Sequence, residues 1–400
     1  MKPRILFVDD EPRILSGVRR ALRSYRNNWQ LVFASSGREA IKLIADKPCN
    51  IVISEMRMPE MDGATLLEWV QEYHPNTIRI ILSGFSDEAA IMRTVGVAHQ
   101  FLAKPINAKR LVDTILEGVE LGELMGSSEL QALFAGIEHL PAIPDRVNRL
   151  IQVLDDAKAN TADIAEILAG DIALTAQTLK LTNSAYFGLP QNVDNLKSAT
   201  SLLGTNLLKT LVMAASFYRM FSGDKSHTPR FERLTRRSID ISRLARAIAE
   251  IENLANSDIN IAGTAGVLAH VGSLVFQSAC PQSFAEVERL IDCENMSIID
   301  AERQVFGAAH PEAGAYLLGL WGFQTKVVRA VACHHEPKDF VGDHIDVLVC
   351  VHAAQQLART VKEGSNLLAA ESEIQATLPQ FGDRAGTWIR LAQNVIERSA

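Results

Sequence analysis

The pattern of apolar and polar residues differs between the first and the second part of this chain of 400 residues. In about the first 120 residues, short apolar runs at 5–8, 31–33, 51–54, 78–82 and 101–103 alternate with stretches in which apolar residues recur at helical spacing. Short apolar runs bounded by turn residues predict strands, and their alternation with helices predicts a doubly wound, five-stranded parallel sheet. A capping box that begins the second helix is predicted from the spacing of Ser36 and Glu39. Two further helix N-caps are predicted at Asp62 and Asn107.

From residue 128 onward, apolar residues recur almost throughout at helical spacing, and no segment has the pattern of paired strands. This rhythm predicts an all-α helical bundle. The last helix of the first domain is expected to run from near Ala108 to about Met125, and a polar stretch at 222–229 is expected to be an internal loop. The predicted domains are 1–122, a linker helix at 123–134, the bundle at 135–355 and a C-terminal helical extension at 356–400.

Composition argues against three classes of protein: nucleic-acid-binding, disulfide- or zinc-stabilised, and membrane-spanning. The net charge of −7, without a block of Lys or Arg, argues against a nucleic-acid-binding surface. Five scattered cysteines without a CxxC pair indicate buried thiols rather than a disulfide framework or a zinc site. No apolar run reaches the roughly eighteen residues that span a bilayer, and the start of the chain turns acidic too soon for a signal peptide. We therefore expect a cytoplasmic protein that does not bind membranes.

Chemically active residues gather at the ends of the predicted strands. Parallel strands bring such ends to one edge of a sheet, where doubly wound folds place their sites. The residues at these positions are Asp9, Asp10, Glu55, Ser83 and Lys104, and Phe101 begins the last predicted strand, three residues before Lys104. Asp9 and Asp10 could hold Mg²⁺, which prefers oxygen ligands, and Lys104 could pair with the carboxylate of Glu55.

The order and spacing of these residues resemble the receiver domains of response regulators. The resemblance implies that Ser83 is the hydroxyl that senses a phosphoryl group, and that Phe101 occupies the place of an aromatic side chain that reports the signalling state. It also places Glu55, four residues before Pro59, where receivers carry the aspartate that is phosphorylated.

Glu55 departs from the receiver pattern by one methylene, and three hypotheses follow. Glutamate could itself accept a phosphoryl group, although its longer arm shifts the oxygen by roughly one bond length and in-line transfer tolerates little misplacement. Glu55 could reach Lys104 or Ser83 and imitate the activated state, as a weak mimic because a phosphoryl group carries nearly two charges. It could also be inert, leaving a docking or dimerisation module.

The second half contains an ordered series of short motifs. These are Leu140-Pro-Ala-Ile-Pro, Gly170-Asp-Ile, Asn183-Ser-Ala-Tyr-Phe-Gly, Ser198-Ala with Leu202-Leu-Gly, and His334-His-Glu-Pro. The series resembles the HDOD family, relatives of the HD phosphohydrolases that have lost parts of their site. One departure is Ile172, where the family usually has proline. The resemblance implies an output domain for motility, biofilm formation or second-messenger control.

Catalysis by this second domain is not expected. An HD enzyme needs a histidine, an adjacent His-Asp pair and further ligands that hold metal and activate water. The resemblance places Arg237 in the position of the first histidine, and Ala269 with His270 in the position of the pair. Arginine stays protonated at neutral pH and cannot ligate a metal.

The remaining histidines of the HD pattern are His310, His334, His335 and His352. We expect these side chains to cap helices or to form hydrogen bonds in the core. A site built from His270, His310 and either His334 or His335 would suit transition metals better than Mg²⁺. His334 and His335 are adjacent, so they are not expected to face the same way on a helix.

The sequence therefore predicts a non-enzymatic two-component signalling regulator that requires no cofactor beyond possible Mg²⁺ in the receiver. Its expected partners are a sensor histidine kinase or other signalling proteins, and it is expected to form a homodimer. The alternative is a metal-dependent HD-type phosphohydrolase that acts on a nucleotide second messenger. Stoichiometric metal after purification would favour that alternative.

Overall fold

The structure is a computed structural model, and it describes the chain except for a set of short segments. These are residues 1, 84–96, 106, 125–127, 138–139, 143, 156–159, 184–192, 214–218, 221–227, 338–340, 363–366 and 398–400. Residues 222–227 of the expected loop at 222–229 and most of the Asn183-Ser-Ala-Tyr-Phe-Gly motif thus lie outside the described residues, and the last two residues of that expected loop are helical. The chain divides into two compact units, and the first consists of Met1–Glu138 with Lys180–Asn192 and Tyr316–Gly322.

The first unit contains the predicted parallel sheet. Its strands are β1 (Arg4–Val8), β2 (Gln30–Ala34), β3 (Ile51–Glu55), β4 (Ile78–Ser83) and β5 (Gln100–Ala103). They pair in the order β2-β1-β3-β4-β5, and every pairing is parallel. In this order β1 and β3 lie at the point where the winding of the chain reverses, so the ends of these two strands face a crevice. The predicted five-stranded doubly wound fold is confirmed.

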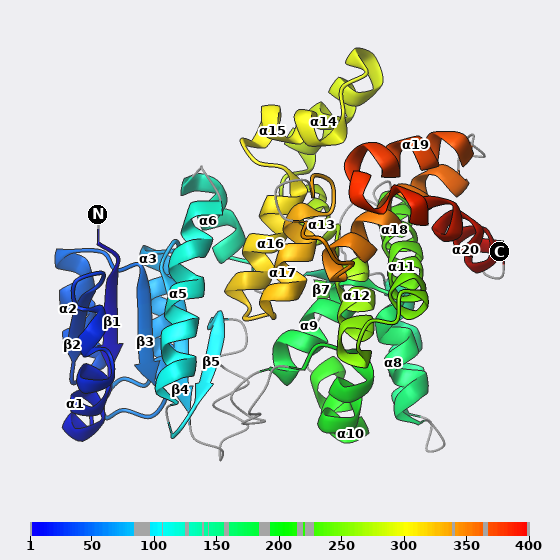
Figure 1. Cartoon of the computed structure of the whole chain (residues 1–400). Coiled ribbons are helices and arrows are strands. Elements are labelled where there is room, and N and C mark those ends of the chain that lie inside the picture. The colour runs from blue at the N-terminus through cyan, green and yellow to red at the C-terminus, as the bar shows by residue number, and fades with distance from the viewer. Residues whose placement is uncertain are drawn as a thin grey trace. The chain divides into compact units, whose positions relative to one another are not determined.

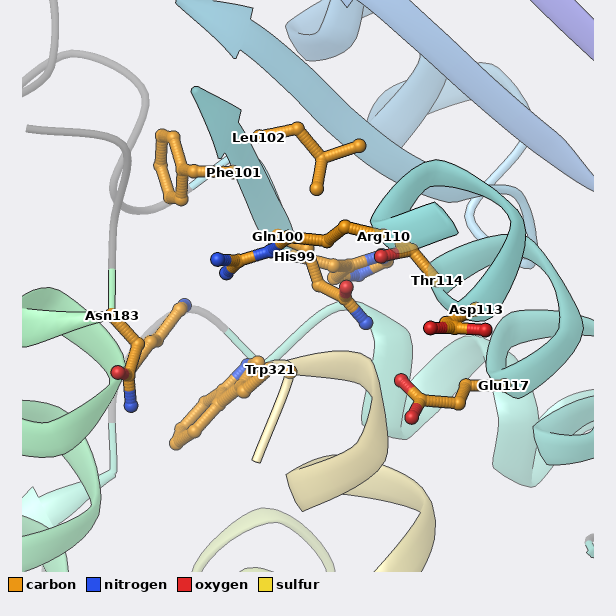
Figure 2. Close-up of a pocket in the computed structure, with 12 residues that line it drawn as sticks. His99, Gln100, Phe101, Leu102, Arg110, Asp113, Thr114, Glu117, Asn183 and Trp321 are labelled. Atoms are coloured by element: carbon orange, nitrogen blue, oxygen red, sulfur yellow. The ribbon is translucent and has the colours of Figure 1, made fainter. Parts of the chain in front are cut away.

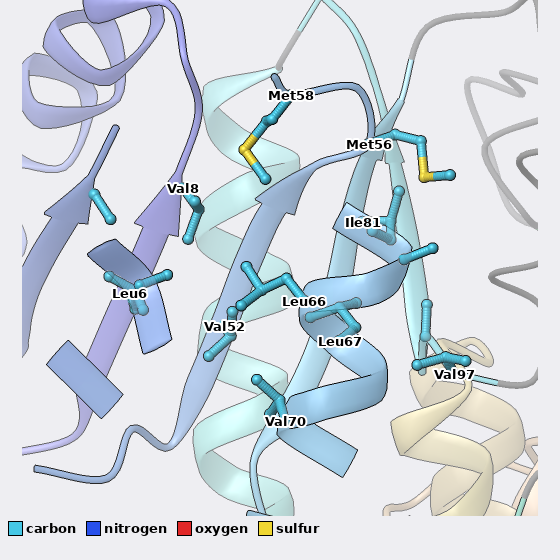
Figure 3. Packing of buried hydrophobic residues seen from close by; sticks show 14 of the residues in the cluster. Leu6, Val8, Val52, Met56, Met58, Leu66, Leu67, Val70, Ile81 and Val97 are labelled. Atoms are coloured by element: carbon cyan, nitrogen blue, oxygen red, sulfur yellow. The ribbon is translucent and has the colours of Figure 1, made fainter. Parts of the chain in front are cut away.

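Helices cover both faces of the sheet (Figure 1). They are α1 (Pro12–Ala21), α2 (Gly37–Asp46), α3 (Gly63–Tyr73) and α5 (Ala108–Leu124), with a short 3₁₀ turn at Arg23–Tyr25. One face packs against α2 and α3 through a cluster of buried side chains that includes Leu6, Val52 and Leu66 (Figure 3). On the other face α5 lies so close to the sheet that a Cβ at Gly118 would be 3.2 Å from the Cδ1 atoms of Ile51 and Ile78.

The predicted caps and turn are present. Ser36 and Asp62 accept hydrogen bonds from the backbone nitrogens of the residues three places later, and Asn107 Oδ1 does the same at the start of α5. The turn after β3 needs glycine at position 63, because a Cβ there would lie 2.2 Å from the carbonyl oxygen of Glu55. This close approach fixes the backbone beside Glu55.

The segment predicted as a linker helix consists of two parts. Helix α5 ends at Leu124 and α6 spans Ser128–Ala135. The side chain of Arg79, which is 1% exposed on β4, donates a hydrogen bond of 2.8 Å to the carbonyl oxygen of Ala135. His99 lies 2.9 Å from the same oxygen. These contacts attach α6 to the first unit.

The second unit is mostly helical. Its helices begin with α7 (Pro144–Asp155), α8 (Thr161–Ala169), α9 (Ile172–Thr182), α10 (Leu196–Met213), α11 (Thr228–Ile251), α12 (Asn256–Leu268) and α13 (Val271–Ala279). They continue with α14 (Pro281–Glu294), α15 (Ile298–Phe306), α16 (His310–Leu320), α17 (Thr325–Cys333), α18 (Val347–Lys362), α19 (Leu367–Thr377), a 3₁₀ turn at Pro379–Arg384 and α20 (Ala385–Glu397). The last residues of α9, from Lys180, and of α16, from Tyr316, belong to the first unit. The sequence missed one short parallel pair, β6 (Pro141–Ala142) with β7 (Arg219–Met220), because two-residue strands leave no periodic signal.

Helix α11 is the centre of this bundle, and α12 and α18 pack along it (Figure 1). Helix α18 runs through residue 355, where a domain boundary was expected, so that boundary falls inside a helix. One stretch, Asn256–Ala279, is long and apolar enough to span a membrane, and 83% of its tested window is buried. It consists of α12 and α13 with a break at Ala269 and His270, and a buried core stretch of this kind is weak evidence for a membrane span.

Candidate functional sites

Three charged side chains meet at the carboxyl edge of the first unit's sheet. Asp9 follows β1, Glu55 ends β3 and Lys104 follows β5. The ammonium of Lys104 lies 2.9 Å from Oδ2 of Asp9 and forms a second ion pair with Oε2 of Glu55. The other carboxylate oxygen of Glu55 accepts a hydrogen bond of 3.1 Å from the backbone nitrogen of Arg57. Both carboxylates are nearly buried, with exposed fractions of 1% for Asp9 and 8% for Glu55.

These contacts keep Lys104 charged. Burial by itself lowers the pKa of Lys104, but the hydrogen bonds and charges of Glu55 and Asp9 outweigh it, so the pKa lies above its usual value. Charge-assisted hydrogen bonds of this kind are about twice as strong as neutral ones. The ammonium therefore ties the ends of β1, β3 and β5 together.

The same oxygens are those that a Mg²⁺ ion would use. Carboxylates suit the ion chemically, and Asp9 and Glu55 supply them on neighbouring strands. Lys104 already pairs with one oxygen of each, so a cation would have to compete with an ammonium for these atoms. The side chain of Asp10 is exposed, and Oδ1 of Asp9 accepts a hydrogen bond of 2.9 Å from the backbone nitrogen of Glu11.

The two remaining receiver positions lie on the neighbouring strands. Ser83 ends β4 and pairs with Ala103 in register, while its side chain lies outside the described part of the chain. Phe101 is 6% exposed on β5 and belongs to the core cluster. Phe101 also lines a pocket of the first unit (Figure 2), together with Asp113 and Glu117 of α5. This aromatic ring is thus turned inward.

Four histidines converge in the second unit. His270 lies between α12 and α13, His310 begins α16, and His334 and His335 follow α17. Each offers one ring nitrogen to a group in which all four ligand atoms lie within 4.8 Å of one another. The ring centroids of His270 and His310 are 5.2 Å apart, and those of His334 and His335 are 4.4 Å apart.

The expectation that His334 and His335 face different ways is wrong. Helix α17 ends at Cys333, so neither histidine is held to helical spacing by continuing turns. Both rings reach His310, at centroid distances of 5.4 Å and 5.0 Å. Two positions where the HD resemblance expects a histidine carry other residues. They are Arg237 on α11 and the fully buried Ala269, whose side chain has no atom that could bind a metal.

Neighbouring groups fix the directions of the rings. Nδ1 of His310 lies 2.6 Å from Oε2 of Glu302, a carboxylate with no exposed surface. Nδ1 of His334 donates to the carbonyl oxygen of Val331 over 2.7 Å. Hydrogen bonds from Nδ1 leave the lone pair on Nε2, and the Nε2 atoms of both residues are buried without a hydrogen-bond partner among the described residues. Nδ1 of His270 lies 3.4 Å from Oγ of Ser238.

Burial also keeps three of these rings neutral. It lowers the pKa of His270, His334 and His335 well below the ordinary value. The charge of Arg237 and of the neighbouring histidines lowers each pKa further. Neutral imidazole is the form that accepts hydrogen bonds and binds metals.

His352 behaves differently from the cluster. Its Nδ1 donates to the carbonyl oxygen of His334 over 2.8 Å and its Nε2 lies 2.8 Å from Oγ1 of Thr377. Both ring nitrogens are thus engaged, and burial lowers its pKa to about 4. His352 fits the expectation of a core histidine that forms hydrogen bonds.

Sequence reasoning missed two residues that shape this site. Glu302 lies three residues after Ile299 and four before Phe306, so it is a carboxylate on the apolar face of a helix, which was a usable signal. Gly272 gave no signal. A Cβ there would lie 2.2 Å from the carbonyl oxygen of His310, so glycine allows the start of α13 to approach the start of α16.

Comparisons with known proteins agree with this architecture. A family model described as the response regulator receiver domain matches residues 5–116, and one described as the HDOD domain matches residues 140–337. The chain is therefore a response regulator in which a receiver domain is followed by an HDOD domain. The family matches say nothing of the replacement at Glu55.

Individual relatives and solved structures match different shares of the chain. The hydrogenase transcriptional regulatory protein HoxA of Cupriavidus necator is 33% identical over 124 residues, which are 30% of this chain and 25% of that protein. A receiver domain of an HD domain-containing protein from Pseudomonas fluorescens is 30% identical, with a TM-score of 0.29, over 30% of this chain and 96% of that one. The MmoQ response regulator of Methylococcus capsulatus is 20% identical, with a TM-score of 0.47, over 63% of this chain and 98% of that one.

Proposed function

We propose that this response regulator is a non-enzymatic signalling component whose receiver is held in one state by Glu55. In this proposal the ion pair between Glu55 and Lys104 takes the place of the phosphoryl-dependent contact of an ordinary receiver. The HDOD domain then acts by binding a partner protein or ligand. A sensor kinase or another signalling protein would dock on the receiver, and the chain would act in the cytoplasm as a homodimer.

The contacts of Lys104 are the observation that carries this proposal. The ammonium bridges Asp9 and Glu55, so the lysine already has its carboxylate partner without any added group. Phe101 is buried on β5, in keeping with a single fixed position of the ring. One carboxylate carries less charge than a phosphoryl group, so the fixed state is expected to be weaker than a phosphorylated one.

Intact mass spectrometry after incubation with acetyl phosphate and Mg²⁺ tests the proposal. We expect Glu55→Asp to gain one phosphoryl group, because the shorter side chain returns the acceptor oxygen to its usual place and Lys104 remains available. Wild type and the matched control Glu55→Gln should gain none. Phosphorylation of the wild type would overturn the proposal, since the protein would then be an ordinary phospho-regulated receiver.

The variant Glu55→Gln also distinguishes a Glu55 that imitates the activated receiver from a Glu55 that is inert. If the ion pair holds the signalling state, Glu55→Gln should change the hydrogen exchange of α5 and the self-association of the chain, because the charge that holds Lys104 is gone. If Glu55 is inert, Glu55→Gln and wild type should behave alike in both measurements.

A metal-dependent phosphohydrolase that acts on a nucleotide second messenger is the second candidate. The convergence of four imidazoles favours it. Arg237 and Ala269, at two positions where HD enzymes have ligands, count against it. Turnover of a cyclic dinucleotide by protein loaded with iron or manganese, abolished in His310→Ala, would support this candidate over the first.

A further inference from the structure

The four-histidine cluster is assembled from three separate parts of the HDOD domain. His270 comes from the break between α12 and α13, His310 from the start of α16, and His334 and His335 from the end of α17. His270, His310 and His334 are each no more than 3% exposed. Packing alone does not require four polar rings at one buried point, since polar atoms in a core are usually paired with one another or with water.

The rings do not satisfy one another. Nε2 of His310 and Nε2 of His334 are buried and lack a hydrogen-bond partner among the described residues. Their Nδ1 atoms are engaged by Glu302 and by the carbonyl oxygen of Val331, so moving the ring proton from Nδ1 to Nε2 would break those bonds, and the tautomer that keeps them has its lone pair on Nε2. A carboxylate that holds Nδ1 of a histidine is the usual outer partner of a metal ligand.

We propose that the HDOD domain binds one transition-metal ion of the Zn²⁺ type through His270, His310, His334 and His335. Neutral imidazoles without a carboxylate among the ligands suit Zn²⁺, Co²⁺ or Ni²⁺ and not Mg²⁺ or Ca²⁺. Zinc–nitrogen bonds of about 2.0–2.1 Å place tetrahedral ligand atoms roughly 3.4 Å apart. The ligand atoms here lie within 4.8 Å of one another, so a small inward movement of the rings closes the site.

The site is structural rather than catalytic. Four protein ligands fill a tetrahedral ion and leave no position for a water molecule to be activated. The ion clamps α13, α16 and the end of α17 to one another. This inference does not depend on the state of the receiver, and a bound metal here is compatible with a non-enzymatic output domain.

The positive charge of Arg237 would repel a cation bound at the cluster, so replacing Arg237 tests where the cation binds. Arg237 is the neighbour of Ser238 on α11, and Oγ of Ser238 lies 3.4 Å from Nδ1 of His270, so α11 brings this positive charge to the cluster. The same charge lowers the pKa of His270, His334 and His335. Removing this charge should tighten binding at the cluster, whereas an ion held by surface histidines elsewhere would be unaffected. We therefore expect Arg237→Gln to bind the metal ion more tightly, and a variant that fails to fold would not show this increase in affinity.

The experiment is a Co²⁺ titration of the chelator-treated full chain, followed by visible absorption and by native mass spectrometry. We expect one tetrahedral Co²⁺ per chain, displaced by one Zn²⁺. His310→Ala and His334→Ala should abolish the tetrahedral band. Glu302→Gln, which loosens only the outer partner, should weaken binding by about 10- to 100-fold, and Arg237→Gln should strengthen it several-fold.

Two histidines outside the cluster serve as controls. His344 is exposed and His352 is buried beside His334 with both ring nitrogens engaged. His344→Ala and His352→Gln should keep the tetrahedral band. The proposal is overturned if wild type binds no Co²⁺, if the band survives in His310→Ala, or if Arg237→Gln weakens binding. Circular dichroism of each variant separates loss of a ligand from loss of the fold.

Discussion

The carboxylate of Glu302 accepts two hydrogen bonds from a single residue, His310. Oε2 of Glu302 lies 2.7 Å from the backbone nitrogen of His310 and 2.6 Å from its Nδ1. Oε1 receives a further bond of 3.3 Å from Oγ of Ser273 on α13. One buried carboxylate therefore connects α15 with the starts of α16 and α13, and it determines which nitrogen of His310 faces the cluster.

Removing this acceptor should destabilise the HDOD domain. In Glu302→Leu the two donors of His310 are left buried without a partner, and each such group costs about 1–3 kcal/mol, so we expect a loss of roughly 2–6 kcal/mol. Glu302→Gln keeps an acceptor oxygen and should lose only about 1 kcal/mol. Urea denaturation with hydrogen exchange of α15 and α16 measures both. Equal losses in the two variants would contradict this account of the acceptor.

Gly272→Ala should be strongly unfavourable, while Gly263→Ala should not. A Cβ at Gly272 would lie 2.2 Å from the carbonyl oxygen of His310, so α13 and α16 must separate, at a cost of about 1–3 kcal/mol or more. At Gly263, inside α12, the nearest atom would lie 3.7 Å away, which is ordinary contact. Alanine there should stabilise the helix by about 0.5–1 kcal/mol.

The urea midpoints of these two glycine variants provide the measurement. Both replacements add the same methyl group to neighbouring helices, so a difference in sign isolates the close approach at His310. If Gly272→Ala were as stable as the wild type, the contact between α13 and α16 would be wrong.

Replacing Lys104 should loosen the receiver in a pH-dependent way. Lys104→Met leaves the carboxylates of Asp9 and Glu55 without their counter-charge, at a cost of about 2–4 kcal/mol, less than for a fully buried pair because Lys104 keeps some contact with water. The pKa of Lys104 is raised above its ordinary value of 10.5. Its contribution is therefore complete below pH 10.5 and is lost as the pH rises through the folded-state pKa.

Hydrogen exchange of the β1 and β3 peptides measures this contribution. The opening free energies of wild type and Lys104→Met should differ by a constant amount between about pH 7 and pH 9 and should converge above about pH 10.5. Lys109→Met, which removes an exposed lysine at the start of α5, should change them by less than about 0.5 kcal/mol. A difference that grows with pH would contradict the assignment.

His352 should make the HDOD domain sensitive to acid. Burial lowers its pKa from 6.5 to about 4, so the unfolded chain takes up a proton before the folded one does. Stability is then complete above pH 6.5 and is lost as the pH falls toward the folded-state pKa. This one group should cost about 2 kcal/mol between pH 7.5 and pH 5, at 1.36 kcal/mol for each pKa unit.

The matched variant is His352→Gln. It should be less stable than wild type at pH 7.5, because the bonds to His334 and Thr377 are disturbed, yet it should lose about 2 kcal/mol less on acidification. Urea midpoints at the two pH values give the comparison. Parallel pH profiles of wild type and variant would show that His352 does not titrate in this range.

The grouping of charged residues at the sheet edge could be predicted from the sequence because each strand is visible there as a short apolar run. A run of three to five mostly apolar residues marks each strand, and a parallel sheet brings the residues that follow the runs to one edge. Asp9, Glu55 and Lys104 could thus be placed together without coordinates. The sequence could not show that the ammonium of Lys104 bridges both carboxylates, because that depends on the length and burial of all three side chains.

The histidine cluster could not be derived in this way. Helical periodicity tells which face of a helix is buried, but His270, His334 and His335 lie at helix ends, where the chain leaves that periodicity. The direction of a side chain at such a break depends on the local backbone and on the neighbours that pack against it. The close approach at Gly272 and the buried carboxylate of Glu302 position His310, and the carbonyl oxygen of Val331 positions His334.

The sequence by itself therefore determined the two domains and the five-stranded sheet, since each is written in local pattern. The tertiary structure alone decided that Lys104 is engaged by two carboxylates and that four histidines from three helix ends share one point. The physical reason is that periodicity is a property of neighbouring residues, whereas a site is a property of packing between segments that are far apart in the chain.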